Sequence, residues 1–286
     1  MTPASLSLAR RAVAALPPAR DRMLARAVGP LWCALDGRRR RAIEANRAAL
    51  AFRFPTARPF ERYLESLLGW LRLLDLEPAD IRARTTIEGL GPVERAAQQR
   101  RGTVLVAAHV GEWEWGAAAL AAAGLPVVAV AGVQMRAAWT PVLRQAKSRL
   151  GVEVVAPDAS PVRLARALRQ GAVVALLVDG DVVTARAAGS IGGHSVDLPL
   201  GPARLASRFG ARLVAGRCRR DAGDPGRYRI ELTPLDDPHA TPALDEAALH
   251  ARVAAWLDSV LHEVPGEWCL FRRFFIPPTP PAAAVA

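Results

Sequence analysis

Short apolar runs alternate with helix-length segments over most of the chain. From residue 85 onward, five valine-rich runs of five to seven residues occur at 103–108, 126–131, 152–156, 172–178 and 212–216. Between these runs, apolar spacing predicts helices at 112–123, 138–150, 161–170 and 201–209. Near-continuous apolar strands that alternate with helices are typical of a parallel sheet covered on both faces. We therefore expect an α/β fold with a mostly parallel central sheet flanked by helices.

Two further segments complete the expected α/β domain. The segment "RYRIELTPL" (227–235) alternates polar and apolar residues, which predicts a half-exposed strand at an edge of the sheet. A last helix is expected at about 243–262. We expect this domain to span 85–276 and to be followed by a disordered tail, 277–286.

The first 84 residues have helical periodicity instead. Helices are expected at 5–16, 21–36, 38–51 and about 59–74. The last of these helices has a single apolar stripe, which comprises Tyr63, Leu67, Trp70, Leu71 and Leu74. We therefore expect a helical N-terminal region, 1–84, beside the α/β domain.

Positive charge is concentrated in this helical region. The chain has a net charge of +11, and residues 1–84 hold 16 arginines against 8 acidic residues (16 − 8 = +8). Such an excess beside apolar helices indicates an anionic membrane surface, nucleic acid, or simply a solvated arginine-rich surface. No nucleic-acid-binding module is recognisable, so we expect membrane contact and no nucleic acid. The expected interfacial patch lies beside Arg38–Arg41 and comprises Trp32, Phe52, Phe54, Phe60 and Trp70, of which Trp70 is also suited to packing on the sheet.

Composition excludes several other classes of protein. Hydrophobic residues make up 51% of the chain, which is enough for a substantial core. The three cysteines, Cys33, Cys218 and Cys269, are widely spaced, so we expect neither a disulfide framework nor a metal site. No stretch has the roughly 18 uninterrupted apolar residues of a membrane-spanning helix.

One strand end carries a concentration of chemically active side chains. In "TVLVAAHVGEWEWGAAALAAAG" (103–124), His109 ends the apolar run and is followed by Glu112, Trp113, Glu114 and Trp115. In open α/β sheets the active crevice lies beyond the carboxyl ends of the strands. If His109 lies in the turn and Glu114 in the first helical turn, the carboxylate can orient the imidazole as a general base. Gly111 permits the tight turn between them.

The spacing of this pair is weak evidence by itself. His262 and Glu267 have the same separation, but they follow a helix and span Pro265. The strand–turn–helix context is therefore what distinguishes His109. The alternative interpretation of His109 is a structural histidine at a strand end.

The segment "HVGEWEWG" (109–116) resembles the His-x4-Asp/Glu signature of the lysophospholipid and glycerolipid acyltransferases. It is most similar to the "H-x-G-N-W-E" form of the bacterial lipid A late acyltransferases (lauroyl and myristoyl transferases) and the related mannoside acyltransferases. Four more segments are similar to that family and occur in its order, namely "RRRRAIEANRAALAFRFP" (38–55), "GAVVALLVDGDVV" (171–183), "VDLPLGPARLASRFGARLVAG" (196–216) and "VPGEWCLFRRFF" (264–275). The resemblance covers about 38 to 275.

This resemblance implies a membrane-associated O-acyltransferase. The family moves a fatty acyl chain from an acyl-carrier-protein or coenzyme A thioester to a hydroxyl of a membrane glycolipid or lysolipid. The resemblance implies His109 as the general base, Glu114 as its orienting partner, and backbone amides near Gly111 as the oxyanion site. It implies no metal and no cofactor besides the thioester co-substrate. It places the protein on the cytoplasmic face of the bacterial inner membrane, peripheral or monotopic.

The resemblance also implies substrate-binding residues, with alternatives. Asp179 and Asp181 either face the same crevice or cap the next turn. Trp113, like Trp115, either lines an acyl groove or wedges its helix against the sheet. The family's arginine in "R-x-x-x-G" is a lysine here, so the candidates for binding an anionic substrate group are Arg144, Lys147 and Arg149.

The chain departs from the family pattern at several positions. Glu112 stands where the family has asparagine, and it either raises the basicity of His109 or points to solvent, as we expect. Arg272 and Arg273 either form a basic edge near the site or, as we expect, a solvated pair. The helices of 1–84 are amphipathic and arginine-rich, whereas family members commonly begin with a membrane helix. The alternative function is a non-catalytic lipid-binding relative, against which the presence of both His109 and Glu114 argues.

Overall fold

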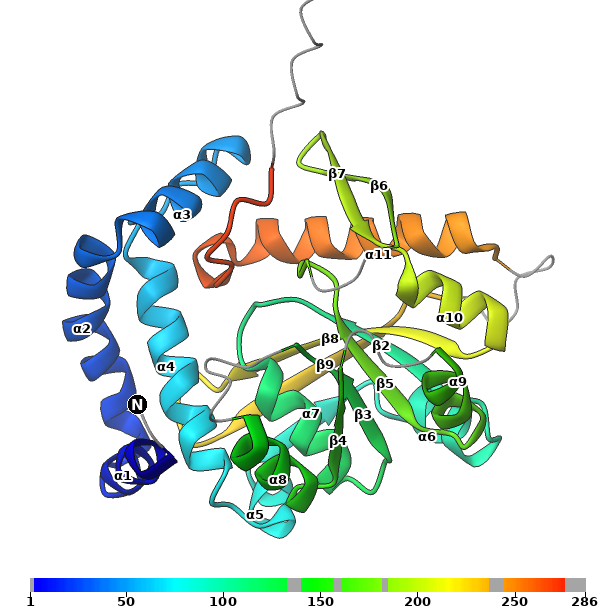
Figure 1. The fold of residues 1–286 in the computed structure, drawn as a ribbon, viewed down its shortest axis with the longest axis horizontal. Coiled ribbons are helices and arrows are strands. Elements are labelled where there is room, and N and C mark those ends of the chain that lie inside the picture. The colour runs from blue at the N-terminus through cyan, green and yellow to red at the C-terminus, as the bar shows by residue number, and fades with distance from the viewer. Residues whose placement is uncertain (1–2, 133–139, 157–160, 182–184, 237–243, 276–286) are drawn as a thin grey trace, which may run out of the picture.

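A seven-stranded sheet forms the centre of the computed structural model, which describes residues 3–132, 140–156, 161–181, 185–236 and 244–275 (Figure 1). The strand order is β1-β9-β8-β2-β5-β3-β4. The strands are β1 (Thr85–Glu88), β2 (Thr103–Ala107), β3 (Val127–Val130), β4 (Val152–Val155), β5 (Val173–Leu177), β8 (Arg212–Arg220) and β9 (Tyr228–Pro234). All adjacent pairs are parallel except β8 and β9. The expected α/β fold with a mostly parallel sheet is confirmed.

Strand β9 differs from its prediction in one respect. It is not an edge strand, because β1 pairs with it in parallel on the side away from β8. A separate antiparallel hairpin, β6 (Arg186–Ile191) and β7 (His194–Pro199), was not predicted. Gly192 and Gly193 form its turn, and both have positive φ, which glycine adopts without strain.

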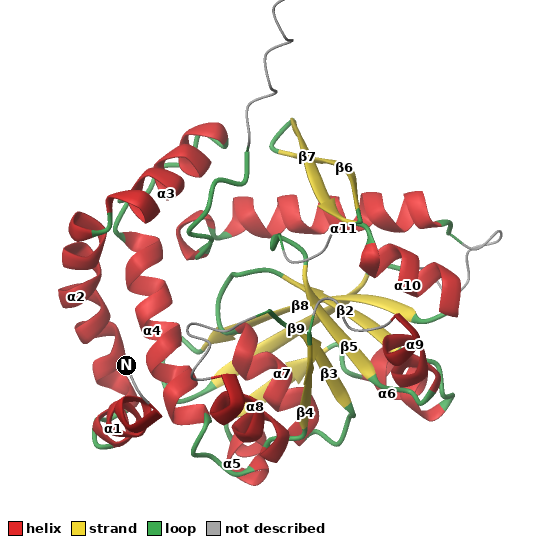
Figure 2. Cartoon of the chain, viewed as in Figure 1, coloured by secondary structure: helices red, strands yellow, loops and turns green. Residues whose placement is uncertain are grey.

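Helices surround the sheet, as Figure 2 shows in red around the yellow strands. In the α/β part they are α5 (Pro78–Ala83), α6 (Gly91–Gln98), α7 (Trp113–Ala122), α8 (Thr140–Arg149), α9 (Pro161–Arg169), α10 (Gly201–Phe209) and α11 (Glu246–Glu263), with a short 3-10 turn η3 (Pro265–Glu267). The expected tail 277–286 lies outside the described residues.

Strand β2 shows why the apolar runs are continuous. Val104 and Val106 pack with α9, α10 and α11 on one face of the sheet, whereas Leu105 packs with α4, α5, α7 and α8 on the other. Since both faces are covered by helices, the strand is apolar at every position from Val104 to Ala107. The strand is thereby packed on both faces in the middle of the sheet, and this packing positions the residues that follow it, including His109.

The N-terminal region is helical, as expected. It comprises α1 (Pro3–Ala14), the 3-10 turn η1 (Pro18–Arg20), α2 (Asp21–Leu35), α3 (Gly37–Ala49) and α4 (Arg58–Leu73). Helix α4 lies between α2 and the sheet (Figure 1). Gly29 allows α2 to approach α4 closely, because a Cβ there would come within 2.7 Å of the Glu61 side chain.

The aromatic residues expected at a membrane interface are largely internal. Phe60 and Trp70 are buried, and Trp32 packs edge-on against Phe60, with 5.0 Å between ring centroids. The large apolar side chains that are exposed in this region are instead Leu8, Met23, Val28, Leu31 and Leu35. Among the described helices, none is both long and apolar enough to cross a membrane.

Candidate active site

His109 and Asp179 are brought together by two adjacent parallel strands. Strands β2 and β5 are paired in register, with Ala107 opposite Leu177. His109 and Asp179 each lie two residues beyond this pair, at the carboxyl ends of their strands. Adjacent parallel strands place equivalent residues side by side at one edge of the sheet. The two side chains therefore meet at the carboxyl edge of the sheet, beyond its middle strands.

Asp179 holds both the backbone and the imidazole of His109. Its Oδ1 lies 2.9 Å from His109 Nδ1, and its Oδ2 accepts the His109 backbone N–H at 2.9 Å. Oδ2 also accepts the indole N–H of Trp268 at 2.9 Å. The carboxylate is completely buried. These hydrogen bonds fix the orientation of the imidazole ring.

The charges of this pair determine which nitrogen of His109 is basic. Burial raises the pKa of Asp179, but His109 and Trp268 lower it to a net value below the usual range. The ionised carboxylate can only accept hydrogen bonds, so Nδ1 is the donor and Nε2 of the neutral imidazole has the lone pair. Burial lowers the pKa of His109, but Asp179 raises it to a net value above its usual 6.5. In the described part of the chain, Nε2 has no hydrogen-bond partner.

Gly111 shapes the turn between His109 and α7. Its φ is +68°, and a Cβ would lie 2.2 Å from the carbonyl oxygen of Cys218, so only glycine fits. The next residue, Glu112, donates its N–H to that carbonyl at 2.8 Å. The Gly111 carbonyl lies 3.4 Å from the hydroxyl of Ser66 on α4. The turn is thus held from both β8 and α4.

Glu114 lies in the first turn of α7, as its spacing predicted, but the carboxylate on Nδ1 of His109 is that of Asp179. Glu114 forms an ion pair with Lys147 of α8, with 2.7 Å between Oε2 and Nζ. It also contributes to raising the pKa of His109 through its charge, as the least of the causes. Arg144 and Arg149 are exposed, whereas Lys147 is buried at the site.

An apolar cavity of about 550 Å³ opens beside His109. Its volume is within the range of small-molecule sites. Trp113, Glu114, Lys147 and Asp181 also line it. Its apolar walls come from α4, α7 and the sheet, and include Leu67, Trp70, Leu120, Ala107, Ala175 and Ile230. Small residues on the sheet face leave this space unfilled.

The two tryptophans of the opening segment have different positions. Trp113 lines the cavity, and its ring centroid lies 5.2 Å from that of His109. Trp115 is buried and stacks on Tyr228 at 3.6 Å, with its indole N–H donated to Thr85. Of the two alternatives, Trp115 therefore wedges α7 against the sheet, and Trp113 faces the cavity.

The segment 268–274 lies against the site, and its contacts with His109 and Asp179 were not among the sequence predictions, although a basic edge near the site was one alternative for Arg272 and Arg273. Cys269 donates its N–H to the His109 carbonyl at 2.8 Å, beside the Trp268 contact described above. Asn46 of α3, which is buried, donates to the Arg272 carbonyl and accepts from the Phe274 N–H, both at 2.8 Å. The expectation of a solvated Arg272 is wrong, because its guanidinium donates to the Asp179 carbonyl and lines the cavity.

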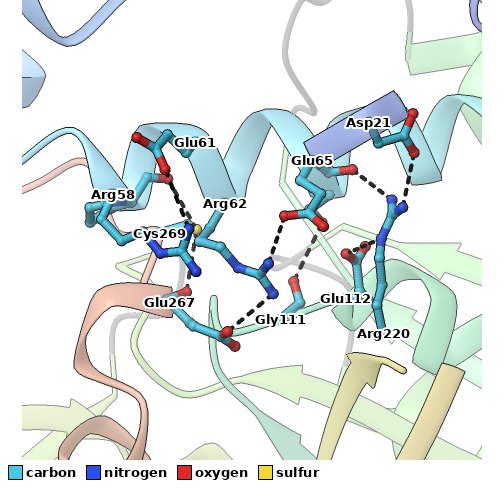
Figure 3. Close-up of polar contacts among 12 residues, drawn as sticks. Asp21, Arg58, Glu61, Arg62, Glu65, Gly111, Glu112, Arg220, Glu267 and Cys269 are labelled. Carbon is cyan, nitrogen blue, oxygen red and sulfur yellow. Dashed lines mark hydrogen bonds and ion pairs between the residues drawn. The ribbon is translucent and has the colours of Figure 1, made fainter. Parts of the chain in front are cut away.

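Glu112 belongs to a buried cluster of charges behind the turn (Figure 3). Arg220, the last residue of β8, donates to Glu112 at 2.8 Å and to Asp21 of α2 at 2.9 Å. A third hydrogen bond reaches the Glu65 carbonyl of α4 at 2.7 Å. The expectation that Glu112 points to solvent is wrong, since its side chain is 5% exposed and paired. The cluster connects α2 and α4 to the turn that carries His109.

Breaking this cluster is expected to destabilise the protein strongly. Burial lowers the pKa of Arg220, but Glu112 raises it to a net value above its usual range, so the guanidinium is charged. Arg220→Met would leave Glu112 without this partner, at a cost of about 3–5 kcal/mol in the free energy of unfolding. Urea denaturation measures this quantity.

A matched control is Arg229→Met. Arg229 forms an exposed ion pair with Glu88, which contributes about 0–1 kcal/mol. Equal losses of stability in the two variants would contradict the importance of the buried cluster.

The family model for bacterial lipid A biosynthesis acyltransferases matches residues 9–276. The chain belongs to this family. No curated protein matches the chain. An acyltransferase of lipid A biosynthesis is consistent with the site, in which a histidine and a carboxylate stand beside an apolar cavity. Within the described part of this acyltransferase, no three His, Cys, Asp or Glu side chains are grouped as metal ligands.

Proposed function

We propose that this acyltransferase moves a fatty acyl chain from a thioester donor to a hydroxyl of a membrane glycolipid or lysolipid, with His109 as general base. One observation carries the proposal. Nδ1 of His109 is hydrogen-bonded to the buried carboxylate of Asp179, and the same imidazole ring lines an apolar cavity. A base fixed beside space for an acyl chain is what transfer from a thioester to a hydroxyl requires.

The proposed reaction uses Nε2 of His109. Nε2 removes the proton of the acceptor hydroxyl as its oxygen attacks the thioester carbonyl. The carbonyl oxygen becomes negatively charged, and backbone amides near Gly111, at the N-terminus of α7, are suited to stabilise it, because the first N–H groups of a helix have no intrahelical acceptor. The C–S bond then breaks, and the imidazolium returns the proton to the leaving thiolate. The products are an ester and a free thiol.

In this mechanism Asp179 is the orienting carboxylate. It keeps the proton on Nδ1 and stabilises the imidazolium that forms. Glu114 supplies a second negative charge and holds Lys147 in the cavity wall. Both acids therefore raise the pKa of His109 and favour its uptake of a proton.

The donor's acyl chain fits the cavity, where Trp113 and the apolar walls exclude water. An acyl-carrier-protein thioester and a coenzyme A thioester present the same reacting group, and both are proposed donors.

We also propose that the face formed by α1 and α2 contacts the cytoplasmic leaflet of the inner membrane. The exposed side chains of α2 include Met23, Val28, Leu31 and Leu35. The acidic residue of this helix, Asp21, is buried and paired, while Arg22 and Arg26 are exposed. Exposed apolar and arginine side chains without an exposed acid suit an anionic lipid surface.

Replacing Leu31 and Leu35 together with glutamate is expected to weaken vesicle binding by at least about tenfold. Each leucine loses roughly 1.5–3 kcal/mol of apolar burial if it inserts, and the added charges repel anionic lipid. Co-sedimentation with vesicles of phosphatidylethanolamine and phosphatidylglycerol measures the effect. Val162→Glu on α9 is the matched control, because Val162 is also an exposed apolar residue. Equal weakening by Val162→Glu would contradict docking through α2.

The proposed activity is tested by thiol release from purified protein. Long-chain acyl-coenzyme A and acyl-carrier protein are supplied in turn with vesicles of total bacterial lipid. We expect thiol release that depends on the lipid and yields an acylated lipid. Tight vesicle binding without turnover of either donor would indicate a non-catalytic lipid-binding relative.

A further inference from the structure

Arg272 presents a positive charge to the cavity without a close carboxylate. Its Nη2 donates to the Asp179 carbonyl, and its Nη1 lies 3.3 Å from the Arg273 carbonyl, so both acceptors are neutral. Its Nε is buried and has no hydrogen-bond partner. The carboxylate within ion-pair range is Asp181, at 3.9 Å from Nε, and the Asp181 side chain is 71% exposed.

The other cationic side chains of the described cavity wall are neutralised. Lys147 pairs with Glu114 at 2.7 Å. Arg217 pairs with Glu231 and Glu263, both at 2.8 Å. Arg272 is therefore the cation of this wall whose charge is available to a ligand.

The backbone and side chain of Arg272 are held in place before any ligand arrives. Asn46 fixes the backbone on both sides of Arg273, as described above. The guanidinium lies over the ring of Phe274, 5.6 Å from its centroid. Burial lowers the pKa of Arg272, and the charges of Asp181 and Asp179 only partly offset this. Arg186, which donates to the neighbouring Gly180 carbonyl at 3.2 Å, lowers the pKa further by like charge, so the net value is below the usual range. An anion at this position would relieve both effects.

We propose that Arg272 binds a phosphate or phosphodiester group of a substrate while His109 carries out the transfer. The inference rests on the proposed function. A guanidinium recognises phosphate oxygens through several N–H groups at once, and the unpartnered Nε provides one of them. Two sources have this chemistry: the phosphodiester of the donor's pantetheine arm and a phosphate on the acceptor lipid. The candidates inferred from sequence, Arg144 and Arg149, are exposed, whereas Arg272 borders the reacting histidine.

Arg272→Gln tests the proposal when two donors are compared. Decanoyl-coenzyme A and decanoyl-N-acetylcysteamine have the same thioester, but the second lacks phosphate. We expect the KM for decanoyl-coenzyme A to rise by about ten- to hundredfold, as for loss of a charged hydrogen bond, with kcat changed much less. The KM for the short thioester should stay the same. Arg272→Lys, which keeps the charge, should restore part of the loss.

A second arm identifies the source of the phosphate, with acceptor vesicles used before and after phosphatase treatment. If Arg272→Gln weakens transfer from both donors and this loss disappears with dephosphorylated vesicles, the phosphate belongs to the acceptor. This result would also support the proposal. An equal loss of transfer with both donors and with both treated and untreated vesicles would overturn the proposal, because Arg272 would then act only by stabilising the turn at Asp179. Arg273→Gln is the matched control, since Arg273 is the exposed neighbour.

Equilibrium binding separates this inference from the proposed function. If the wild-type protein turns over neither donor, the acyltransferase mechanism is wrong. Isothermal titration with coenzyme A and co-sedimentation with the untreated vesicles then decide the role of Arg272. Weaker binding of either probe to Arg272→Gln supports the phosphate site, and unchanged binding of both overturns it.

Discussion

Replacement of His109 by alanine is expected to reduce acyl transfer by about 10²- to 10⁴-fold, the usual contribution of a positioned general base. Without Nε2, the acceptor hydroxyl has no group to take its proton as it attacks the thioester. The measurement is the initial rate of acylated-lipid formation, with circular dichroism to show that the fold is retained. Since His109 is at a strand end, its removal leaves the packed strand β2 intact.

The chain contains its own control for this experiment. His262 precedes Glu267 at the same sequence separation, but its Nδ1 lies 2.8 Å from the Asp258 carbonyl within α11. His262→Ala should therefore leave the rate unchanged. Transfer that survives in His109→Ala would mean that the base lies elsewhere.

Asp179→Asn is expected to lower the rate to a similar extent, by up to about 10⁴-fold, because an amide can leave the proton on the wrong imidazole nitrogen. The pH profile gives a second signature. Burial lowers the pKa of His109, but Asp179 raises it to a net value above 6.5. Transfer requires the neutral imidazole, so kcat/KM should rise with pH and level off above this raised pKa.

In Asp179→Asn the main cause of the raised pKa is absent. The rising limb of the profile should therefore move to lower pH while its plateau falls. Asp181→Asn is the control, because Asp181 is mostly exposed and its ion-pair contact is to Arg272 at 3.9 Å. A limb that stays in place in Asp179→Asn would show that Asp179 does not set the basicity of His109. Glu114 would then be the carboxylate to examine.

The apolar pattern predicted the buried strands well, because both faces of these strands are covered by helices. It was wrong about β9, where an alternating pattern suggested an edge. Strand β1 has only four residues, Thr85–Glu88, and its register with β9 depends on a pairing between segments far apart in the sequence. Local periodicity contains no information about such a partner. The β6–β7 hairpin, by contrast, does have a local signal in the sequence, the Gly192–Gly193 turn.

Several residues of the candidate site could be predicted from the sequence, but the contacts between them could be predicted less well. His109 and Asp179 both follow apolar runs, and each could be recognised as a strand-end side chain. Their contact depends on β5 lying next to β2, although β3 and β4 come between them in the sequence. Glu114 is nearer to His109 in the sequence, so spacing favoured it as the orienting acid. Trp268 is about 90 residues from Asp179, and only the folded chain brings the two together.

The Glu112–Arg220 contact has an evolutionary consequence. These residues are 108 positions apart, and the loss of Arg220 leaves the buried carboxylate of Glu112 without its partner, whereas the loss of Glu112 leaves Arg220 with the carboxylate of Asp21. A deficit of about 3–5 kcal/mol is a large part of the 5–15 kcal/mol that stabilises most domains, so Arg220 cannot change before Glu112 without risk to folding. Relatives with asparagine at the position of Glu112 can therefore keep the arginine, paired with the acid at the position of Asp21. Across the family, the arginine is expected to be lost only where the glutamate is absent as well.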